Sequence, residues 1–423
     1  MAVAVTGSGG CEVPDRRTPN ACMAPSVDGN REDWAVTAVP ERLFTVVFIV
    51  LALCELAYFS AAGLTIPLTP LFAEGPMGAN ELWVGITVGA FSVSTVALRP
   101  FAGRLSDRRG RRPLLIGGAL LCAAALAAHP LAPNLAVLIG LRLVLGVAEA
   151  FFFVAAFAAL ADIAPTGRAG EALSFNSLAL YLGIALGPLL GEWLLDAGGF
   201  TPAWIGGAAL AVAAGGLAIV IGETAPAREA DAPPTPLFHP AALGPGLAIF
   251  AGTAAMGGFL AFVALHAGDV GMQGAGPALL LFGMVVVVSR IAFSRLPDRV
   301  PPARLIAAAL AVAAVGMGVA SLVNSTPGLL FGAALLGVGM ALLTPAVFAA
   351  TLARVPPRER GSAMATVSIF IDLAFGAGPI LVGFVAGLAS ITAGFASVGA
   401  LAALAAVVVA LRFRPQPALA VEP

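Results

Sequence analysis

Four of the ionisable residues inside otherwise apolar stretches of this sequence are Glu55, Arg142, Glu149 and Asp372. A carboxylate held away from water can bind and release a proton, because desolvation favours its neutral form and an approaching arginine favours its charged form. Charges at such positions are costly unless they face a partner or a water-filled cavity. These four residues are therefore candidates for proton coupling in a substrate cavity, and the elements that carry them determine what the coupling serves.

The composition predicts that these elements are membrane helices. Of 423 residues, 59% are hydrophobic and 11% are charged, with a mean hydropathy of +0.97, whereas an ordinary soluble domain carries about 25% charged residues. Lipid is the solvent that suits such a chain. The net charge of −1 gives no sign of a nucleic-acid partner. Residues 1–42 lack the apolar core of a cleavable signal peptide and predict a disordered cytoplasmic tail.

Twelve stretches have the roughly 20 mostly apolar residues that a membrane helix needs. They are 43–63, 82–102, 113–129, 134–160, 173–194, 202–222, 243–265, 276–294, 303–323, 328–352, 362–388 and 391–411. The third is short and has no clear end before Pro130, so length alone leaves eleven or thirteen spans possible.

The arginines favour an even number of spans and predict the orientation. The chain has no lysine, and arginines outside the spans fall only in alternate loops and the tails. The other set of loops is acidic, with Glu74, Glu81, Asp196 and Asp269. Short arginine-rich loops stay in the cytoplasm, so both termini are predicted there and the protein in the cell membrane.

The sequence repeats itself at an offset of 191 residues. Arg99 falls on Arg290, Asp107 falls on Asp298, and the pair Gly187-Pro188 falls on Gly378-Pro379. An even number of spans per copy gives parallel repeats. We expect an all-α fold of two six-helix bundles, at 43–222 and 243–411, joined by a cytoplasmic linker at 223–242 and followed by a tail at 412–423. Two such bundles facing each other favour a transporter over a channel.

The loop after the second span carries the most specific motif. It reads Gly103-Arg104-Leu105-Ser106-Asp107-Arg108-Arg109-Gly110-Arg111-Arg112. Its arginines alone could be topological anchors, but that leaves the two glycines and the aspartate unexplained. With this motif the chain resembles the major facilitator superfamily, whose signature Gly-x-x-x-Asp-Arg-x-Gly-Arg-Arg is matched at every fixed position, and the resemblance extends from about residue 43 to residue 411.

The resemblance implies roles for three groups of residues. The loop would act as a cytoplasmic latch formed by Gly103, Asp107, Arg108, Gly110, Arg111 and Arg112, with Asp107 meeting Arg108, Arg112 or the chain near Gly361. In span five, Gly183, Gly187 and Pro188 are similar to the helix-bending motif of antiporters in this family, with Glu192 in place of its last glycine. Ordinary close packing explains these small residues as well.

The resemblance also places spans one and four around a central cavity. It implies that Glu55 pairs with Arg142 or reaches toward Glu149, although a structural salt bridge within the first bundle would fit the same residues. Asp372 corresponds to Tyr181 in the repeat, and fits either a second coupling site or a contact between the bundles.

Together these features favour a secondary active antiporter that exports small organic molecules in exchange for protons. The alternatives are a proton-coupled importer of a sugar or organic acid, and a sensor or scaffold that no longer transports. The partners would be a small-molecule substrate, protons and the lipid bilayer, and the protein would be a monomer. No spacing indicates an enzyme, a cofactor, a metal site or a nucleic-acid interface.

Overall fold

The computed structural model describes residues 43–165, 168–225, 239–293, 295–356 and 359–412, all within one compact unit. The two tails and most of the predicted linker lie outside the described residues, so the predictions made for them stay predictions.

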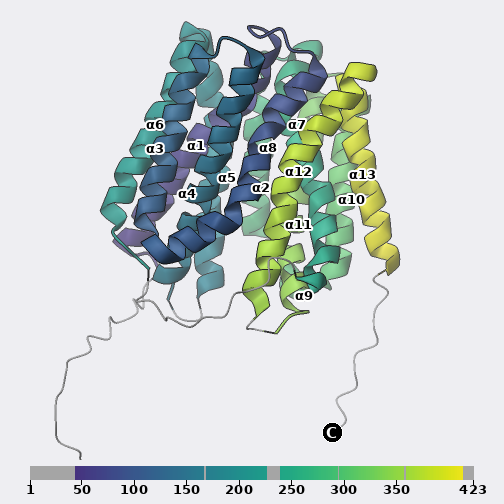
Figure 1. The fold of residues 1–423 in the computed structure, drawn as a ribbon. Coiled ribbons are helices and arrows are strands. Elements are labelled where there is room, and N and C mark those ends of the chain that lie inside the picture. The colour runs from purple at the N-terminus through teal and green to yellow at the C-terminus, as the bar shows by residue number, and fades with distance from the viewer. Residues whose placement is uncertain (1–42, 166–167, 226–238, 294, 357–358, 413–423) are drawn as a thin grey trace, which may run out of the picture. The chain divides into compact units, whose positions relative to one another are not determined.

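Twelve apolar helices make up most of the described chain, together with a few short ones (Figure 1). Eleven are long and apolar enough to cross a membrane: α1 (Val46–Glu74), α2 (Glu81–Arg109), α3 (Arg112–Ala128), α4 (Leu135–Ile163), α5 (Ala169–Gly198), α6 (Phe200–Ile221), α7 (Leu243–Asp269), α10 (Pro302–Leu322), α11 (Thr326–Leu352), α12 (Arg360–Leu388) and α13 (Ile391–Arg412). Helix α3 reaches a span of 20 residues by continuing through η1 (His129–Leu131), whereas the twelfth helix, α8 (Gly276–Ala292), is apolar but ends after 17 residues. The short helices are α9 (Leu296–Arg299), η1 and η2 (Pro240–Ala242).

Each of the twelve predicted stretches coincides with one of these apolar helices. The largest difference is in α1, which continues to Glu74, although the apolar stretch was expected to end at residue 63. Pro67 and Pro70 lie inside this helix and are buried. A proline leaves a helical carbonyl without its usual donor, and membrane helices tolerate this where neighbouring helices cover the site.

The loops alternate between two ends of the bundle, as the arginine pattern predicted. We call the end that carries the described loop arginines the basic end; these are Arg104, Arg108, Arg109, Arg111, Arg112, Arg168, Arg295, Arg299, Arg304, Arg354, Arg360 and Arg412. Helix α9 lies at this end (Figure 1). The described turns at the opposite end contain no arginine. There, the side chains of Asn80, Asn134 and Ser325 accept hydrogen bonds from the first turns of α2, α4 and α11 and so satisfy exposed helix donors.

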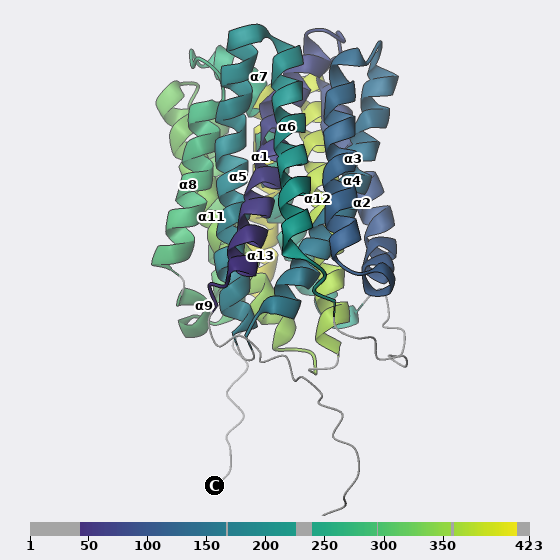
Figure 2. The same cartoon turned by 90° about the vertical axis from the view of Figure 1, so that its left-hand side faces the viewer.

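The helix packing follows the sequence repeat. In the first half, α1 packs on α5 and α6, and α2 packs on α4; in the second, α7 packs on α12 and α13, and α8 packs on α11. Two seams join the halves: α2 lies against α12, and α8 lies against α5, with a smaller contact between α1 and α7 (Figures 1 and 2). Each seam is the image of the other under the offset of 191 residues.

One pair of glycines shows the repeat at atomic detail. Gly146 of α4 lies directly against the Phe91 carbonyl of α2. At the equivalent place, a Cβ on Gly337 of α11 would lie 2.9 Å from the Phe282 carbonyl oxygen of α8. The same close helix crossing is therefore built twice, because only glycine lets the two backbones approach so closely.

Candidate functional site

An ion pair joins the two halves inside the helix bundle. Arg99 of α2 meets Asp372 of α12, with Nη2 2.7 Å from Oδ1 and Nε 2.6 Å from Oδ2. The side chains are 14% and 9% exposed. The Arg99 guanidinium also lies over the ring of Phe153 from α4, 4.7 Å from its centroid. Of the two interpretations of Asp372, the structure shows the contact between the halves.

Glu149 of α4 adds a second carboxylate to this ion pair. It is partly buried, interacts electrostatically with both Arg99 and Asp372, and interacts with the hydroxyl of Tyr58 from α1. Arg99 bonds Asp372, Glu149 adds a second carboxyl group within electrostatic range, and the cluster carries a net charge of −1 when both carboxyl groups are ionised. We call Arg99, Glu149 and Asp372 the central cluster.

The repeat builds a related contact at the other seam. Arg290 of α8 corresponds to Arg99, and it donates to Ser177 Oγ at 3.2 Å and to the Tyr181 hydroxyl at 3.1 Å, both on α5. Its guanidinium lies 4.4 Å from the centroid of the Tyr181 ring. Because Tyr181 corresponds to Asp372, the two arginines reach across to equivalent positions, one to a carboxylate and the other to a phenol.

Glu55 does not meet Arg142. It is fully buried where α1 packs on α5, and its Oε2 accepts a hydrogen bond of 2.6 Å from the amide nitrogen of Asn176. Arg142 instead donates to the carbonyl oxygens of Thr87 and Val88 on α2, at 3.3 and 3.1 Å. The expected pair fails because α1 turns Glu55 toward α5, whereas α4 turns Arg142 toward α2.

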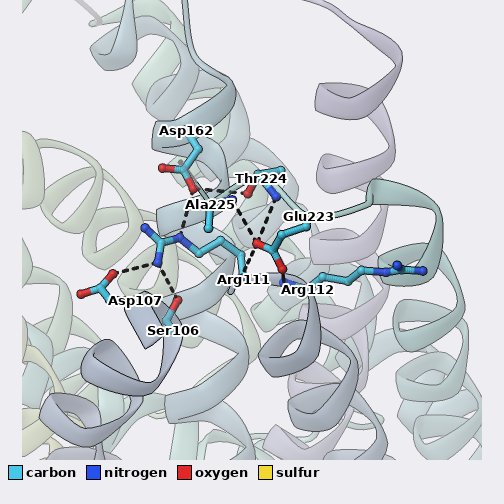
Figure 3. A network of polar contacts seen from close by, with 8 residues as sticks. All are labelled: Ser106, Asp107, Arg111, Arg112, Asp162, Glu223, Thr224 and Ala225. Atoms are coloured by element: carbon cyan, nitrogen blue, oxygen red, sulfur yellow. Dashed lines mark hydrogen bonds and ion pairs between the residues drawn. The ribbon is translucent and has the colours of Figure 1, made fainter. Parts of the chain in front are cut away.

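The predicted latch is held within the first half (Figure 3). Arg111 Nη1 lies 2.7 Å from Asp107 Oδ1, and Arg111 Nε lies 3.0 Å from Asp162 Oδ2 at the end of α4. Asp107 was expected to meet Arg108, Arg112 or the chain near Gly361, but its described partner is Arg111, and its side chain is 73% exposed. Hydrogen bonds to Asp107 and Asp162 raise the pKa of Arg111, although burial opposes this shift.

Glu223 completes this network from the end of α6. Its carboxylate accepts from the backbone N–H groups of Arg111 and Arg112, at 2.8 and 3.3 Å, where α3 begins. Desolvation alone would raise the pKa of Glu223, but four backbone N–H donors outweigh it and lower the pKa below its ordinary value. Gly110 has a φ of +92°, and a Cβ there would lie 2.5 Å from the Glu223 Cδ.

Two latch residues have no contact of this kind. A Cβ on Gly103 would meet open space, and the Arg108 side chain is exposed. In the described part of the chain, these two positions are therefore free of the tight packing that fixes Gly110.

The predicted bending motif lies where α5 packs against α1, within the first half. Helix α5 continues through Pro188. Gly187 lies against the α1 backbone, and a Cβ on Gly183 would lie 2.8 Å from Phe59 Cβ. Pro188 cannot bond the Ile184 carbonyl, which lies beside Gly63 of α1. The motif therefore places two backbones in close contact, with small residues on both sides.

Glu192, which replaces the last glycine of that motif, reaches across the second seam. Its carboxylate accepts from the backbone N–H groups of Ala275 and Gly276, at 2.6 and 2.8 Å, where α8 begins. Helix α8 has no side-chain cap of its own. Glu192 thus provides, from the other half of the protein, the N-terminal cap that α2 obtains from Asn80, the residue directly before it. We call this contact the cross-cap.

Twelve apolar helices in two repeated halves, tied together by buried charged groups, define a membrane transporter that works by alternating access. Residues 51–326 and 298–423 both match the family model of the Major Facilitator Superfamily. The chain belongs to this superfamily, as the loop motif indicated.

Relatives and solved structures agree with this membership. The chain is 31% identical to an uncharacterized MFS-type transporter of Salmonella typhimurium, over 81% of this chain and 89% of that protein. It is 30% identical to one of Burkholderia mallei, over 87% and 90%. The fold resembles a bacterial homologue of the human lysosomal transporter Spinster (TM-score 0.70, 15% identity, covering 88% and 98%) and the human organic anion transporter MFSD10 (0.66, 20%, 86% and 98%).

Proposed function

We propose that this transporter couples the export of small organic molecules to the entry of protons. The central cluster carries the proposal, because the Arg99–Asp372 ion pair crosses from one half to the other and a second carboxyl group, Glu149, interacts electrostatically with both members of the pair. A single added proton makes the cluster neutral.

The cluster offers two arrangements of equal total charge. In the described one, Arg99 pairs with Asp372, and a proton on Glu149 completes neutrality. When the halves separate at this level, Arg99 loses Asp372 and turns to Glu149 on its own half, while Asp372 takes the proton. The proton therefore changes carboxylate as the halves move, and coupling follows when Asp372 takes the proton from water on one side and Glu149 has released its own proton to water on the other.

Glu55 and Arg142 support this cycle from the first half. Glu55 provides a further buried carboxyl, one turn from the tyrosine that faces Glu149. Arg142 fixes α4 to α2 through two carbonyl groups, which keeps Glu149 and Arg99 on neighbouring helices. Export is the direction proposed because the Gly-Pro motif of α5 is typical of antiporters in this family.

The proposal places the basic end in the cytoplasm, with the protein a monomer in the cell membrane and its halves at 43–222 and 243–411. Single cysteines at Gly78, opposite the basic end, and at Arg108, at the basic end, test this orientation in a cysteine-free background. A membrane-impermeant reagent added to intact cells should label the cysteine at position 78 and not that at 108. The reverse pattern would contradict the orientation.

Reconstitution into liposomes tests the coupling. A pH gradient is imposed, and labelled cationic, neutral and anionic organic solutes are tried in turn while internal pH is recorded. A transported solute should move protons in the opposite direction, and Glu149→Gln and Asp372→Asn should each abolish that proton movement. Asp196→Asn, an exposed carboxylate on α5, is the matched control. Proton-driven exchange that survives both central variants would refute the mechanism, and proton movement in the same direction as the solute would indicate an importer.

A further inference from the structure

Glu55 and Asn176 form a buried pair that none of the contacts described so far explains. Both residues are 0% exposed, and the amide nitrogen of Asn176 donates to Glu55 Oε2 at 2.6 Å. The pair lies about 14 Å along α1 from its first residue. At this position neither residue reaches bulk water.

No cation compensates Glu55 among the described side chains. Cys54 is the titratable neighbour that interacts with Glu55, and its thiol donates to the Ala214 carbonyl of α6. The charged side chains of the neighbouring helices have other partners or lie elsewhere: Arg99 binds Asp372, Arg142 binds α2 carbonyls, Glu149 faces Tyr58, and His266 and Asp269 of α7 lie at the opposite end. An ionised Glu55 would thus be a buried charge without a counterion, which is costly.

Two oxygen atoms of the pair also lack a donor. Glu55 Oε1 and Asn176 Oδ1 are buried without a hydrogen-bond partner. Both atoms are acceptors when Glu55 is ionised, so neither can satisfy the other. A proton on Oε1 turns one of them into a donor, and rotation about the soft terminal torsions lets it bind Oδ1. One proton therefore removes the buried charge and satisfies both oxygens.

We propose that Asn176 is the positioning residue that holds a proton on Glu55 as a reciprocal acid–amide pair. In this pair the carboxyl O–H donates to the amide oxygen and the amide N–H donates to the other carboxyl oxygen. Release requires α1 and α5 to part so that water reaches the pair; the proton then passes to that water, and Glu55 stays as a carboxylate bound by the amide N–H alone. This rests on the proposed function and deepens it, because it assigns a further proton-binding group and its partner.

Infrared spectroscopy of the purified full-length chain tests the pair without any substrate. At neutral pH, the wild type should show a carboxylic-acid C=O band that Glu55→Gln removes. Asn176→Leu, which has similar size and no hydrogen bonds, should keep this band and move it to higher wavenumber, because the acid then loses both partners. Asp196→Asn, at an exposed carboxylate of α5, is the matched control and should leave the band in place. If Glu55→Gln does not fold, Glu55→Asp serves instead and should shift the band.

Three results would overturn the proposal. They are carboxylic-acid absorption that is identical in Glu55→Gln and the wild type, a Glu55 band whose position Asn176→Leu does not change, and loss of the Glu55 band on adding NaCl at constant pH, which would assign the pair to Na⁺. The infrared readout is independent of transport. Failure of coupling in liposomes with an intact Glu55 band would refute the central-cluster mechanism alone.

Discussion

The cross-cap predicts that Glu192 holds α5 and α8 together at the end opposite the basic one. The perturbations are Glu192→Gln and Glu192→Ala. The carboxylate accepts two backbone hydrogen bonds, at 2.6 and 2.8 Å, and hydrogen bonds to a charged group each contribute about 1.5–3 kcal/mol. Glutamine keeps one oxygen and loses the charge, so we expect a loss of about 2 kcal/mol. Alanine loses both bonds and leaves α8 uncapped.

This loss acts only on the state in which the seam is closed. When α5 and α8 separate at this end, wild-type Glu192 gives up the same two bonds to water. A change of about 2 kcal/mol therefore shifts the equilibrium roughly thirtyfold toward the separated state in Glu192→Gln, since every 1.4 kcal/mol is tenfold.

Distances between spin labels measure the shift. Labels at Ala197 and Gln273, both exposed near the cross-cap, should report a growing population at longer separation in Glu192→Gln and a larger one in Glu192→Ala. Asp196→Asn, on the same helix end, should leave the distribution unchanged. An unaltered distribution in Glu192→Ala would show that the cross-cap does not control this seam.

Three further outcomes follow from the described contacts. Gly110→Ala should lower the unfolding free energy in detergent by about 1–3 kcal/mol, because it forces a side chain into positive φ and against Glu223; an unchanged melting temperature would contradict the network. The pKa of Glu223 is lowered in the fold, so its contribution to stability is complete above its ordinary pKa of about 4.3 and is lost as pH falls toward the lowered value; Glu223→Gln should flatten that part of the thermal-stability profile, and a parallel profile would argue against it. Gly89→Leu should separate α2 from α12, because a Cβ there would lie 2.7 Å from the Gly376 carbonyl oxygen; cysteine accessibility near Gly376 should rise, and no change would show that the seam yields elsewhere.

Hydropathy and the arginine pattern were sufficient to predict the helices and their two ends, because both depend on the solvent around each segment. The offset of 191 residues predicted which helices are equivalent, and the packing follows that equivalence. Neither signal says which face of a helix meets which neighbour. The expected Glu55–Arg142 pair failed for this reason.

The residues that the sequence analysis missed have identifiable causes. Arg99 was visible both as an intramembrane charge and as the repeat partner of Arg290, so the same signal that selected Asp372 could have found it. Asn176 is neutral, so no charge in the sequence marks it until the fold places it beside Glu55. Glu192 was read as a departure from a motif, whereas its role depends on the start of α8, 83 positions away.

The two seams between the halves are fastened unequally along their length. At the level of the two equivalent arginines, one seam has the Arg99–Asp372 ion pair, whereas the other has hydrogen bonds from Arg290 to the neutral side chains of Ser177 and Tyr181. Beyond that level, the second seam is clamped by Glu192 at the end far from the arginine loops. At the basic end, the halves therefore separate more easily between α5 and α8 than between α2 and α12. The Glu192 contact at the opposite end then acts as the pivot of this movement.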